Sequence, residues 1–491
     1  MAEQYLLDIK EKDEMSQLLA ETAATTLHCN SHIETIQQGK NRIIISRIPQ
    51  DSVAIVFSVG GDIKELRTRE YAESAIKRLL HAGKNISADL IGFADVIDAR
   101  RTNRGLVEVI GETLAREARK RGLGILNGEL ANLGIRVVSE YNLSLTGLGF
   151  IPKASKFAKE IPGTFTHDKI NYAVFDPKLL PIFINSDGIR TKTELYERTG
   201  EFKLGVNDFF AMNLDDCVKL GTVPQVISGV VETKGAIPFK KINKHAVKLG
   251  KTLEILSILQ HEPMENRILG YDFFAPSYNI SGSVVSTIDE ETLRALPMPH
   301  AGDYLIAIRG KPNPRSNGIT VKRELMERLF GKDWHKTREG KVFIKYLAQP
   351  STIFYPVFKD LFDKDLASSV YHMSGGAYNG KLARPLAKHN LFVKIGKDDT
   401  CAIEDLFEPD WREILMSAYT LSVRDAYAIW PMGNEAFVTS NYPIRAKDII
   451  RHKFGLEART VGRLETAVNG HAGVMLRTYN GQEVYFNGLA A

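Results

Sequence analysis

Residues 183–195 read FINSDGIRTKTEL and combine the end of a strand, a turn and the start of a helix. The apolar residues that precede Asn185 are typical of a strand, and the Asp-Gly pair that follows is a common turn dipeptide. Asp187 and Lys192 place an acid and a base close together around this turn. Two interpretations are open. The stretch is either an ordinary turn or a place where a metal-bound polyphosphate meets the backbone, because backbone N–H groups after a turn suit phosphate.

Length and composition describe an ordinary globular protein of several domains. The 491 residues are too many for one core, so we expect two to four domains. The net charge of +5 is nearly balanced for this length, and we expect no nucleic-acid partner. The three cysteines lie far apart, the N-terminus is too polar for a secretory signal, and no apolar run approaches the ~20 residues of a membrane span. We therefore expect a cytoplasmic protein with free thiols and no membrane partner.

The element order of residues 42–151 returns in residues 181–288. In both stretches, segments rich in β-branched residues alternate with segments of helical apolar spacing. The similar tetrapeptides YNLS at 141–144 and YNIS at 278–281 occupy the same place in this order. We interpret the pattern as a diverged internal duplication, with chance similarity as the alternative.

The repeats and the linker-like segments between them predict how the chain divides. In the second copy, we expect residues 247–260 to form a helix and residues 267–276 to form a strand and a loop. The predicted divisions are a first repeat at 1–151, a second repeat at 165–290, a third domain at 300–466 and a C-terminal hairpin or tail at 467–491. The predicted fold class is mixed, α+β or α/β.

Five motifs between residues 187 and 386 occur in the order of a known family. They are DGIRTK (187–192), AMNLDDCVKLG (211–221), PNPRSNGITVKREL (312–325), YLAQPSTIFYPVFKDLF (346–362) and YHMSGGAYNGKLARPL (371–386). Together they resemble the PurM-like superfamily, and within it phosphoribosylformylglycinamidine cyclo-ligase, also called aminoimidazole ribonucleotide synthetase. In that enzyme the first motif reads DGVGTK. The resemblance covers roughly residues 170–465 and is specific as an ordered set.

The resemblance implies both an architecture and an activity. The family is a dimer whose N-terminal domains pair into a barrel, so two tandem PurM N-terminal-like domains are expected to pair internally as a pseudo-dimer barrel. A PurM C-terminal-like α/β domain follows, and the whole chain is expected to be a monomer or a homodimer. The implied activity is that of an ATP-dependent ligase of purine biosynthesis, with ATP and Mg²⁺ as cofactors and a small phosphoribosyl substrate.

The resemblance also implies a nucleotide site, for which we name residues individually. Asp187, Lys192 and Asp216 are expected to be catalytic. Mg²⁺ prefers carboxylate oxygens, and the expected metal ligands are Asp187, Asp216 and Glu129. The expected ATP or phosphate contacts are Gly188, Asn213, Asp215, Ser374, Gly375 and Gly376.

Two of these assignments leave alternatives open. Adjacent helix residues point about 100° apart, so Asp215 and Asp216 are not expected to face one site. We favour Asp216 as the ligand, with Asp215 supporting it or facing solvent; the alternative for both is an exposed charged helix face. Glu129 comes from the first repeat. The alternative is that this repeat is a diverged copy that serves only as a packing partner, in which case Glu129 is a solvated acid.

The third domain is expected to bind the other substrate through Arg315, Ser316, Asn317 and Arg384. Small residues let backbone amides approach an anion, so the loop at 374–376 is expected to hold the ribose phosphate with help from Arg384. The alternatives are a helix-capping turn for this loop and a plain N-cap for 316–318.

Two departures from the family pattern leave the reaction open. Arg315 stands where the family has a histidine and cannot act as a general base. Tyr271 stands where the family has a glutamate, whereas Glu129 in the first repeat lies in a similar NGELA context. Beside the cyclo-ligase, the alternatives are a non-catalytic nucleotide-binding or scaffold protein and an ATP-dependent enzyme that acts on another substrate.

Overall fold

A computed structural model describes residues 2–38, 41–61, 68–137, 139–235, 237–263, 278–309, 315, 318–396, 416–417, 420–478 and 480–488. Contacts divide the chain into two compact units. Residues 7–217 and 222–294 form the first, which we call the repeat unit. Residues 295–491, together with 1–6 and 218–221, form the second, which we call the C-terminal unit. Within the described residues, no helix combines the length and the apolar character needed to cross a membrane.

The repeat unit contains two sheets of six described strands each. The first sheet has the order β5-β4-β6-β3-β8-β7. Its strands are β3 (Ser52–Gly60), β4 (Asp89–Ala99), β5 (Gly124–Asn132), β6 (Tyr141–Pro152), β7 (Gly163–His167) and β8 (Ile170–Phe175). The second sheet has the order β1-β2-β9-β12-β10-β11. Its strands are β1 (Ile33–Gln38), β2 (Asn41–Ser46), β9 (Ile182–Gly188), β10 (Val223–Thr233), β11 (Leu256–Pro263) and β12 (Tyr278–Thr287).

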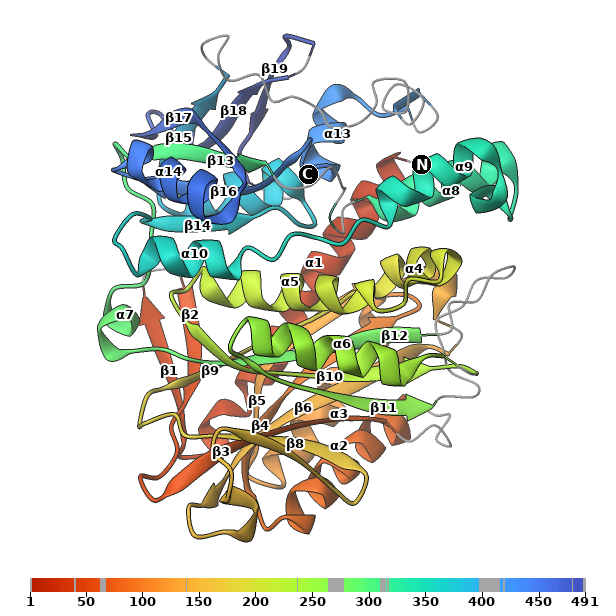
Figure 1. The fold of residues 1–491 in the computed structure, drawn as a ribbon, viewed down its shortest axis with the longest axis vertical. Coiled ribbons are helices and arrows are strands. Elements are labelled where there is room, and N and C mark those ends of the chain that lie inside the picture. Colours follow the sequence, from red (N-terminus) through yellow and green to blue (C-terminus); the bar gives the residue numbers. More distant parts are fainter. Residues whose placement is uncertain are drawn as a thin grey trace. The chain divides into compact units, whose positions relative to one another are not determined.

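Helices flank these two sheets (Figure 1). They are α1 (Ala2–Ala24), α2 (Thr68–Asn85), α3 (Arg104–Arg119), α4 (Thr193–Thr199), α5 (Leu204–Val218), α6 (Phe239–Thr252) and α7 (Glu290–Arg294). The buried side chains of α2 and α3 pack on the first sheet. On the second sheet, α6 contacts β11.

The predicted duplication is confirmed by the strand order and the register. The series β5-β4-β6-β3 of the first sheet corresponds to β11-β10-β12-β9 of the second. In the first copy Asp98 lies opposite Asn142, and in the second Glu232 lies opposite Asn279. The YNLS and YNIS tetrapeptides therefore occupy equivalent positions in the two sheets. Asp98 and Glu232 are structural counterparts.

The prediction of one helix over residues 247–260 is wrong in its second half. Helix α6 ends at Thr252, and β11 begins at Leu256. The apolar run that starts at Leu256 is short and buried, and such runs are ambiguous between helix and strand. The strand and loop expected at 267–276, and Tyr271 within it, lie outside the described residues. By register, Gln260 is the counterpart of Glu129. Glu129 on β5 pairs with a valine of β4, and Gln260 on β11 pairs with the equivalent valine of β10.

Each of the two sheets includes a hairpin that lies outside the repeat predicted to form that sheet. Hairpin β1–β2 precedes the first repeat's own strands, yet β2 pairs with β9 through Ser46 and Ile182. Hairpin β7–β8 begins in the segment predicted as a linker and pairs with β3. The predicted boundaries remain predictions, and both sheets gain strands that cover an edge.

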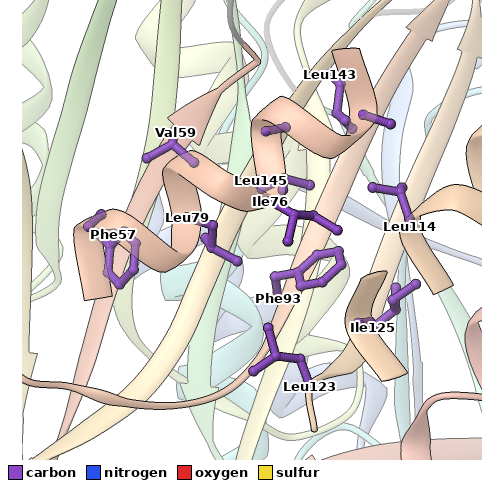
Figure 2. Packing of buried hydrophobic residues seen from close by; sticks show 14 of the residues in the cluster. Phe57, Val59, Ile76, Leu79, Phe93, Leu114, Leu123, Ile125, Leu143 and Leu145 are labelled. Atoms are coloured by element: carbon purple, nitrogen blue, oxygen red, sulfur yellow. The ribbon is translucent and has the colours of Figure 1, made fainter. Parts of the chain in front are cut away.

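Alternating side chains of β3 explain how the two sheets pack. One face of β3 carries Val53, Ile55, Phe57 and Val59, which join the cluster beneath α2 and α3. Figure 2 shows this cluster, in which Phe93 and Ile76 lie among leucines of several elements. The other face of β3 joins a second cluster shared with the second sheet: Ala54, Val56, Ile91, Leu148, Ile184, Val226, Ile258 and Val285 are among its members. The two sheets therefore pack face to face, as the predicted internal pseudo-dimer requires.

Buried hydroxyl pairs also join the two sheets across this interface. Ser144 and Ser281 are equivalent residues of the YNLS and YNIS tetrapeptides. Their Oγ atoms lie 2.8 Å apart. The Oγ atoms of Ser58 and Ser228 lie 2.7 Å apart. All four side chains are almost fully buried, so these hydrogen bonds satisfy groups that would otherwise be costly to bury.

The C-terminal unit is a separate α/β layer structure. Its sheet has the order β14-β16-β13-β17-β15-β18-β19. The strands are β13 (Tyr304–Arg309), β14 (Ser369–His372), β15 (Leu391–Ile395), β16 (Asn434–Ser440), β17 (Glu457–Thr466), β18 (Gly473–Arg477) and β19 (Glu483–Phe486). The helices are α8 (Ile319–Phe330), α9 (Arg338–Leu347), α10 (Tyr355–Phe362), α11 (Arg384–Lys388), α13 (Val423–Ile429) and α14 (Pro443–Phe454). Strands β18 and β19 form a hairpin within residues 467–491.

Replacement of Leu79 by alanine tests the packing of α2 on the first sheet. Leu79 is fully buried, so its loss is expected to lower the free energy of unfolding by about 2–5 kcal/mol. The matched control is Leu179→Ala, because Leu179 is 56% exposed; we expect a change within about 0.5 kcal/mol. All three tryptophans lie at positions 334, 411 and 430, so unfolding of the repeat unit is followed by far-UV circular dichroism. Equal losses in the two variants would contradict the core position of Leu79.

Candidate functional site

One arginine lies between carboxylates from both repeats. Strand β9 ends at Gly188, and a 3₁₀ turn (Arg190–Lys192) follows it. The Arg190 guanidinium contacts Asp98 (Nε to Oδ1, 3.1 Å), Glu129 (Nη2 to Oε1, 3.0 Å) and Asp187 (Nη1 to Oδ1, 3.3 Å). We call these four residues the Arg190 cluster. The expectation that Asp187 and Glu129 of different repeats come together is met in this structure, with the guanidinium between them.

The sequence reasoning did not single out Arg190. Its backbone has φ of +46°, in the left-handed region that glycine adopts readily and other residues rarely do. In the family motif DGVGTK a glycine stands where DGIRTK has this arginine. A charged residue at a glycine position was the signal that could have identified Arg190.

The Asp187 carboxylate is held from several sides. Its Oδ1 accepts a hydrogen bond from the Gly188 backbone N–H at 2.7 Å. Burial raises the pKa of Asp187 to about 6, Arg190 opposes the rise, and the nearby charges of Glu129 and Asp216 add to it. Asp216 is therefore close enough to Asp187 for their charges to interact, as a shared site requires.

Helix α5 places three further predicted residues near this turn. The Asn213 amide donates to the backbone oxygen of Phe209 at 3.0 Å and to that of Asp187 at 3.5 Å. Asp215 is fully buried, so the interpretation that it faces solvent is wrong. Asp216 is half-buried. Of the two neighbouring acids, Asp216 is the more accessible, which agrees with its choice as the candidate ligand.

Lys192 is paired inside the protein. Its Nζ lies 2.9 Å from Oδ1 of Asp208, and both side chains are fully buried. The hydroxyl of Tyr196 also contacts Asp208. The ammonium group thus compensates a buried carboxylate, and its predicted contact with a phosphate remains a prediction.

The residues present do not fit the predicted magnesium site as a set of three carboxylates. Among the described residues, no group of three or more His, Cys, Asp or Glu side chains is arranged to hold a metal ion. Mg²⁺ needs oxygen ligands at about 2.0–2.1 Å in octahedral array. One oxygen of Asp187 and one oxygen of Glu129 instead contact the guanidinium of Arg190.

Buried acids lie behind the cluster, and the sequence reasoning missed them. Burial raises the pKa of Asp95 to about 7, and the charge of Glu129 adds to the rise. Burial, together with the charge of Asp98, raises the pKa of Glu232 to about 8. The Asn279 amide donates to Asp98 Oδ2 at 3.1 Å. Asp98, Asn279 and Glu232 form a buried polar layer between the repeats, whereas Asp95 lies on the other face of β4 with Phe93 and Ile97.

In the C-terminal unit, Arg315 is fully buried among protein groups. Its Nη1 donates to the backbone oxygen of Thr352 at 3.1 Å and lies 3.4 Å from Oε2 of Glu435. Its Nη2 lies 3.4 Å from Nδ1 of His372, and its guanidinium lies 5.3 Å from the ring centre of Phe354. The predicted grip of Arg315 on an anionic substrate remains a prediction. Ser316 and Asn317 lie outside the described residues.

The small-residue loop at 374–376 connects β14 to a π-helical turn (Tyr378–Ala383). Ser374 is buried and Gly375 is exposed, while Gly376 has φ of +85°. Arg384 donates through Nε to the backbone oxygen of Gly488 at 3.1 Å. The loop precedes a helical segment as predicted, and phosphate binding by these residues remains a prediction.

Comparison with known proteins agrees with the family predicted from the sequence. No family model matches the chain. The phosphoribosylformylglycinamidine cyclo-ligase of Thermococcus kodakarensis is 24% identical over 198 residues, which cover 39% of this chain and 56% of that protein. The cyclo-ligase of Pyrococcus horikoshii is 25% identical over 219 residues, which cover 44% of this chain and 61% of that protein. The match thus spans little more than half of these relatives. It confirms the predicted resemblance to the PurM-like superfamily.

Solved structures give a more distant likeness. PurL of Thermotoga maritima in complex with FGAR has a TM-score of 0.40 and 14% identity, and covers 67% of this chain and 47% of that one. Thiamine monophosphate kinase of Aquifex aeolicus has a TM-score of 0.36 and 11% identity, with coverage of 63% and 90%. At these scores we base no functional inference on the two structures.

Replacement of Glu232 by glutamine tests the buried acid layer through pH. The pKa of Glu232 rises from 4.5 to about 8 in the folded state, so the folded protein keeps a proton that the unfolded chain has lost. Stability from this group is complete below pH 4.5 and falls as pH rises toward 8, by at most about 1.4 kcal/mol per pH unit. The Glu232→Gln variant is expected to show a smaller fall in unfolding free energy over this range, measured by chemical unfolding. The exposed control Glu254→Gln should keep the wild-type slope; a wild-type slope in both variants would contradict the assignment.

Proposed function

We propose that the chain is an ATP-dependent enzyme of the PurM-like type that activates a phosphoribosyl substrate. The single observation that carries this proposal is the Arg190 cluster, in which the DGIRTK motif of the second repeat meets Asp98 and Glu129 of the first. It is supported by the order of the family motifs and by the sequence match to cyclo-ligases.

The proposed reaction is that of a phosphoribosylformylglycinamidine cyclo-ligase. ATP would phosphorylate the formyl or amide oxygen of the substrate, and a substrate nitrogen would then displace phosphate and close the imidazole ring. Phosphoryl transfer depends on positioning and on charge neutralisation more than on covalent help from the protein. We therefore assign to Asp187 and Asp216 the positioning of the nucleotide at the end of β9.

In the C-terminal unit, the proposed substrate contacts are the loop at 374–376 and Arg384 for the ribose phosphate. Arg315, which Glu435 and His372 contact, is proposed to grip an anionic substrate or intermediate. Because guanidinium stays protonated, Arg315 donates hydrogen bonds and cannot move a proton.

A specific observation favours a second candidate, a non-catalytic protein that binds nucleotide. Two of the three bases implied in phosphate or substrate binding are neutralised inside the fold, Lys192 by Asp208 and Arg315 by Glu435. A third candidate is an ATP-dependent enzyme on another substrate, favoured by Arg315 in place of the family histidine.

Incubation of the purified chain with Mg-ATP and formylglycinamidine ribonucleotide separates these candidates. The cyclo-ligase predicts ADP release that depends on this substrate and falls at least about 100-fold in Asp216→Asn. The matched control is Asp51→Asn, an exposed acid of the same unit that is expected to keep full activity.

Each of the other outcomes selects a different candidate. ATP binding without turnover would favour the non-catalytic protein. Turnover only with another acceptor would favour the third candidate, and absence of both binding and turnover would overturn the proposal.

A further inference from the structure

The Arg190 cluster gathers its carboxylates from three strands and two repeats. Asp98 comes from β4, Glu129 from β5 and Asp187 from β9. The side chain of Arg190 is 17% exposed, and those of Asp98, Glu129 and Asp187 are 2%, 29% and 19% exposed. Grouped acids with so little contact with water are strongly destabilising unless a cation compensates them.

The Arg190 guanidinium supplies a permanent positive charge that compensates these carboxylates. Arginine stays protonated at every accessible pH, and its planar fork donates in several directions at once. Arg190 uses Nε, Nη1 and Nη2 on three different carboxylates. A second cation, Lys12, lies 3.4 Å from Glu129 at the edge of the cluster.

Two unsatisfied amides show that the surroundings of Asp98 suit an oxygen-seeking cation. Asn142, directly opposite Asp98 on β6, is 2% exposed, and within the described part of the chain neither its Oδ1 nor its Nδ2 has a hydrogen-bond partner. Asn279 donates its Nδ2 to Asp98, while its Oδ1, also buried, is without a partner in the same part of the chain. Amide and carboxylate oxygens are the ligands that hard divalent cations prefer.

A divalent cation among these carboxylates would compete with Arg190 for oxygens that the guanidinium already uses and would lie close to its positive charge. Oδ1 of Asp98, Oε1 of Glu129 and Oδ1 of Asp187 each accept from the guanidinium, whereas a small divalent cation must take such oxygens into its own first shell. The left-handed backbone at residue 190 is also one that glycine adopts without strain.

From these contacts we propose that Arg190 is a built-in cation that takes the place of a divalent metal ion between the two repeats. The wild-type cluster is closed to divalent cations. Removal of this one side chain opens a divalent-cation site, with Asp98, Glu129 and Asp187 as its carboxylate ligands. The proposal does not depend on the enzymatic activity proposed above.

Binding of Mn²⁺ to the full chain, measured by electron paramagnetic resonance after treatment with a chelator, tests the proposal. Wild type is expected to show no saturable Mn²⁺ site that depends on Asp187. The Arg190→Gly variant is expected to gain one such site and to bind Mn²⁺ at least about tenfold more tightly than wild type. Its midpoint of thermal unfolding should lie below that of wild type without the ion and should rise when Mn²⁺ is added.

Two further variants make the result specific to the cluster. Asp187→Asn in the Arg190→Gly background is expected to abolish the gained site. The matched control is Arg104→Gly, because Arg104 is 72% exposed and pairs with the single carboxylate of Glu108; it should gain no site.

The proposal also has outcomes that overturn it. If Arg190→Gly does not fold, Arg190→Gln keeps most of the side-chain volume without the charge and is expected to gain a weaker Mn²⁺ site. A folded Arg190 variant without a gained site would overturn the proposal. An Mn²⁺ site in wild type that disappears in Asp187→Asn would overturn it without reference to any Arg190 variant.

Discussion

Face-to-face burial of two similar sheets decides where every candidate residue of the repeat unit lies. The apolar side chains between the sheets bring β4 and β5 of the first copy against β9 of the second. Only for that reason can Asp98, Glu129 and Asp187 bind the same guanidinium. Neither copy has this set of side chains alone, since by register Gln260 is the counterpart of Glu129 and Val59 is the counterpart of Asp187. The site is a property of the pair.

The features that could be predicted from the sequence are those that leave a local pattern of residue types along the chain. Segments rich in β-branched residues, such as 53–59, and the matching YNLS and YNIS tetrapeptides were sufficient to predict strands and the duplication. Residues 253–260 were misjudged because a short buried apolar run has no distinctive period. The direction and partner of a charged side chain in a turn leave no local pattern. For that reason the motif singled out Asp187 as a candidate, yet gave no indication that Arg190 faces Asp98, or that Lys192 faces Asp208 on another helix.

Neutralised charges are a common feature of the two units, each considered separately. Lys192 with Asp208, and Arg315 with Glu435, are fully buried ion pairs. Such pairs often add little net stability, because desolvation offsets their attraction, but loss of one partner leaves an uncompensated charge. Their geometry is therefore held firmly. A ligand that engages either base has to share it with a carboxylate already in place.

The exchange of hairpins between the two copies has a consequence for how the chain acquires its structure during synthesis. Strand β2 leaves the ribosome early, but its partner β9 begins only at Ile182. Until then the edge of the β1–β2 hairpin is unpaired and can associate with another nascent chain, as exposed strand edges do. The second sheet therefore cannot be completed until strands on both sides of the first copy have been made, whereas all strands of the first sheet lie within residues 52–175.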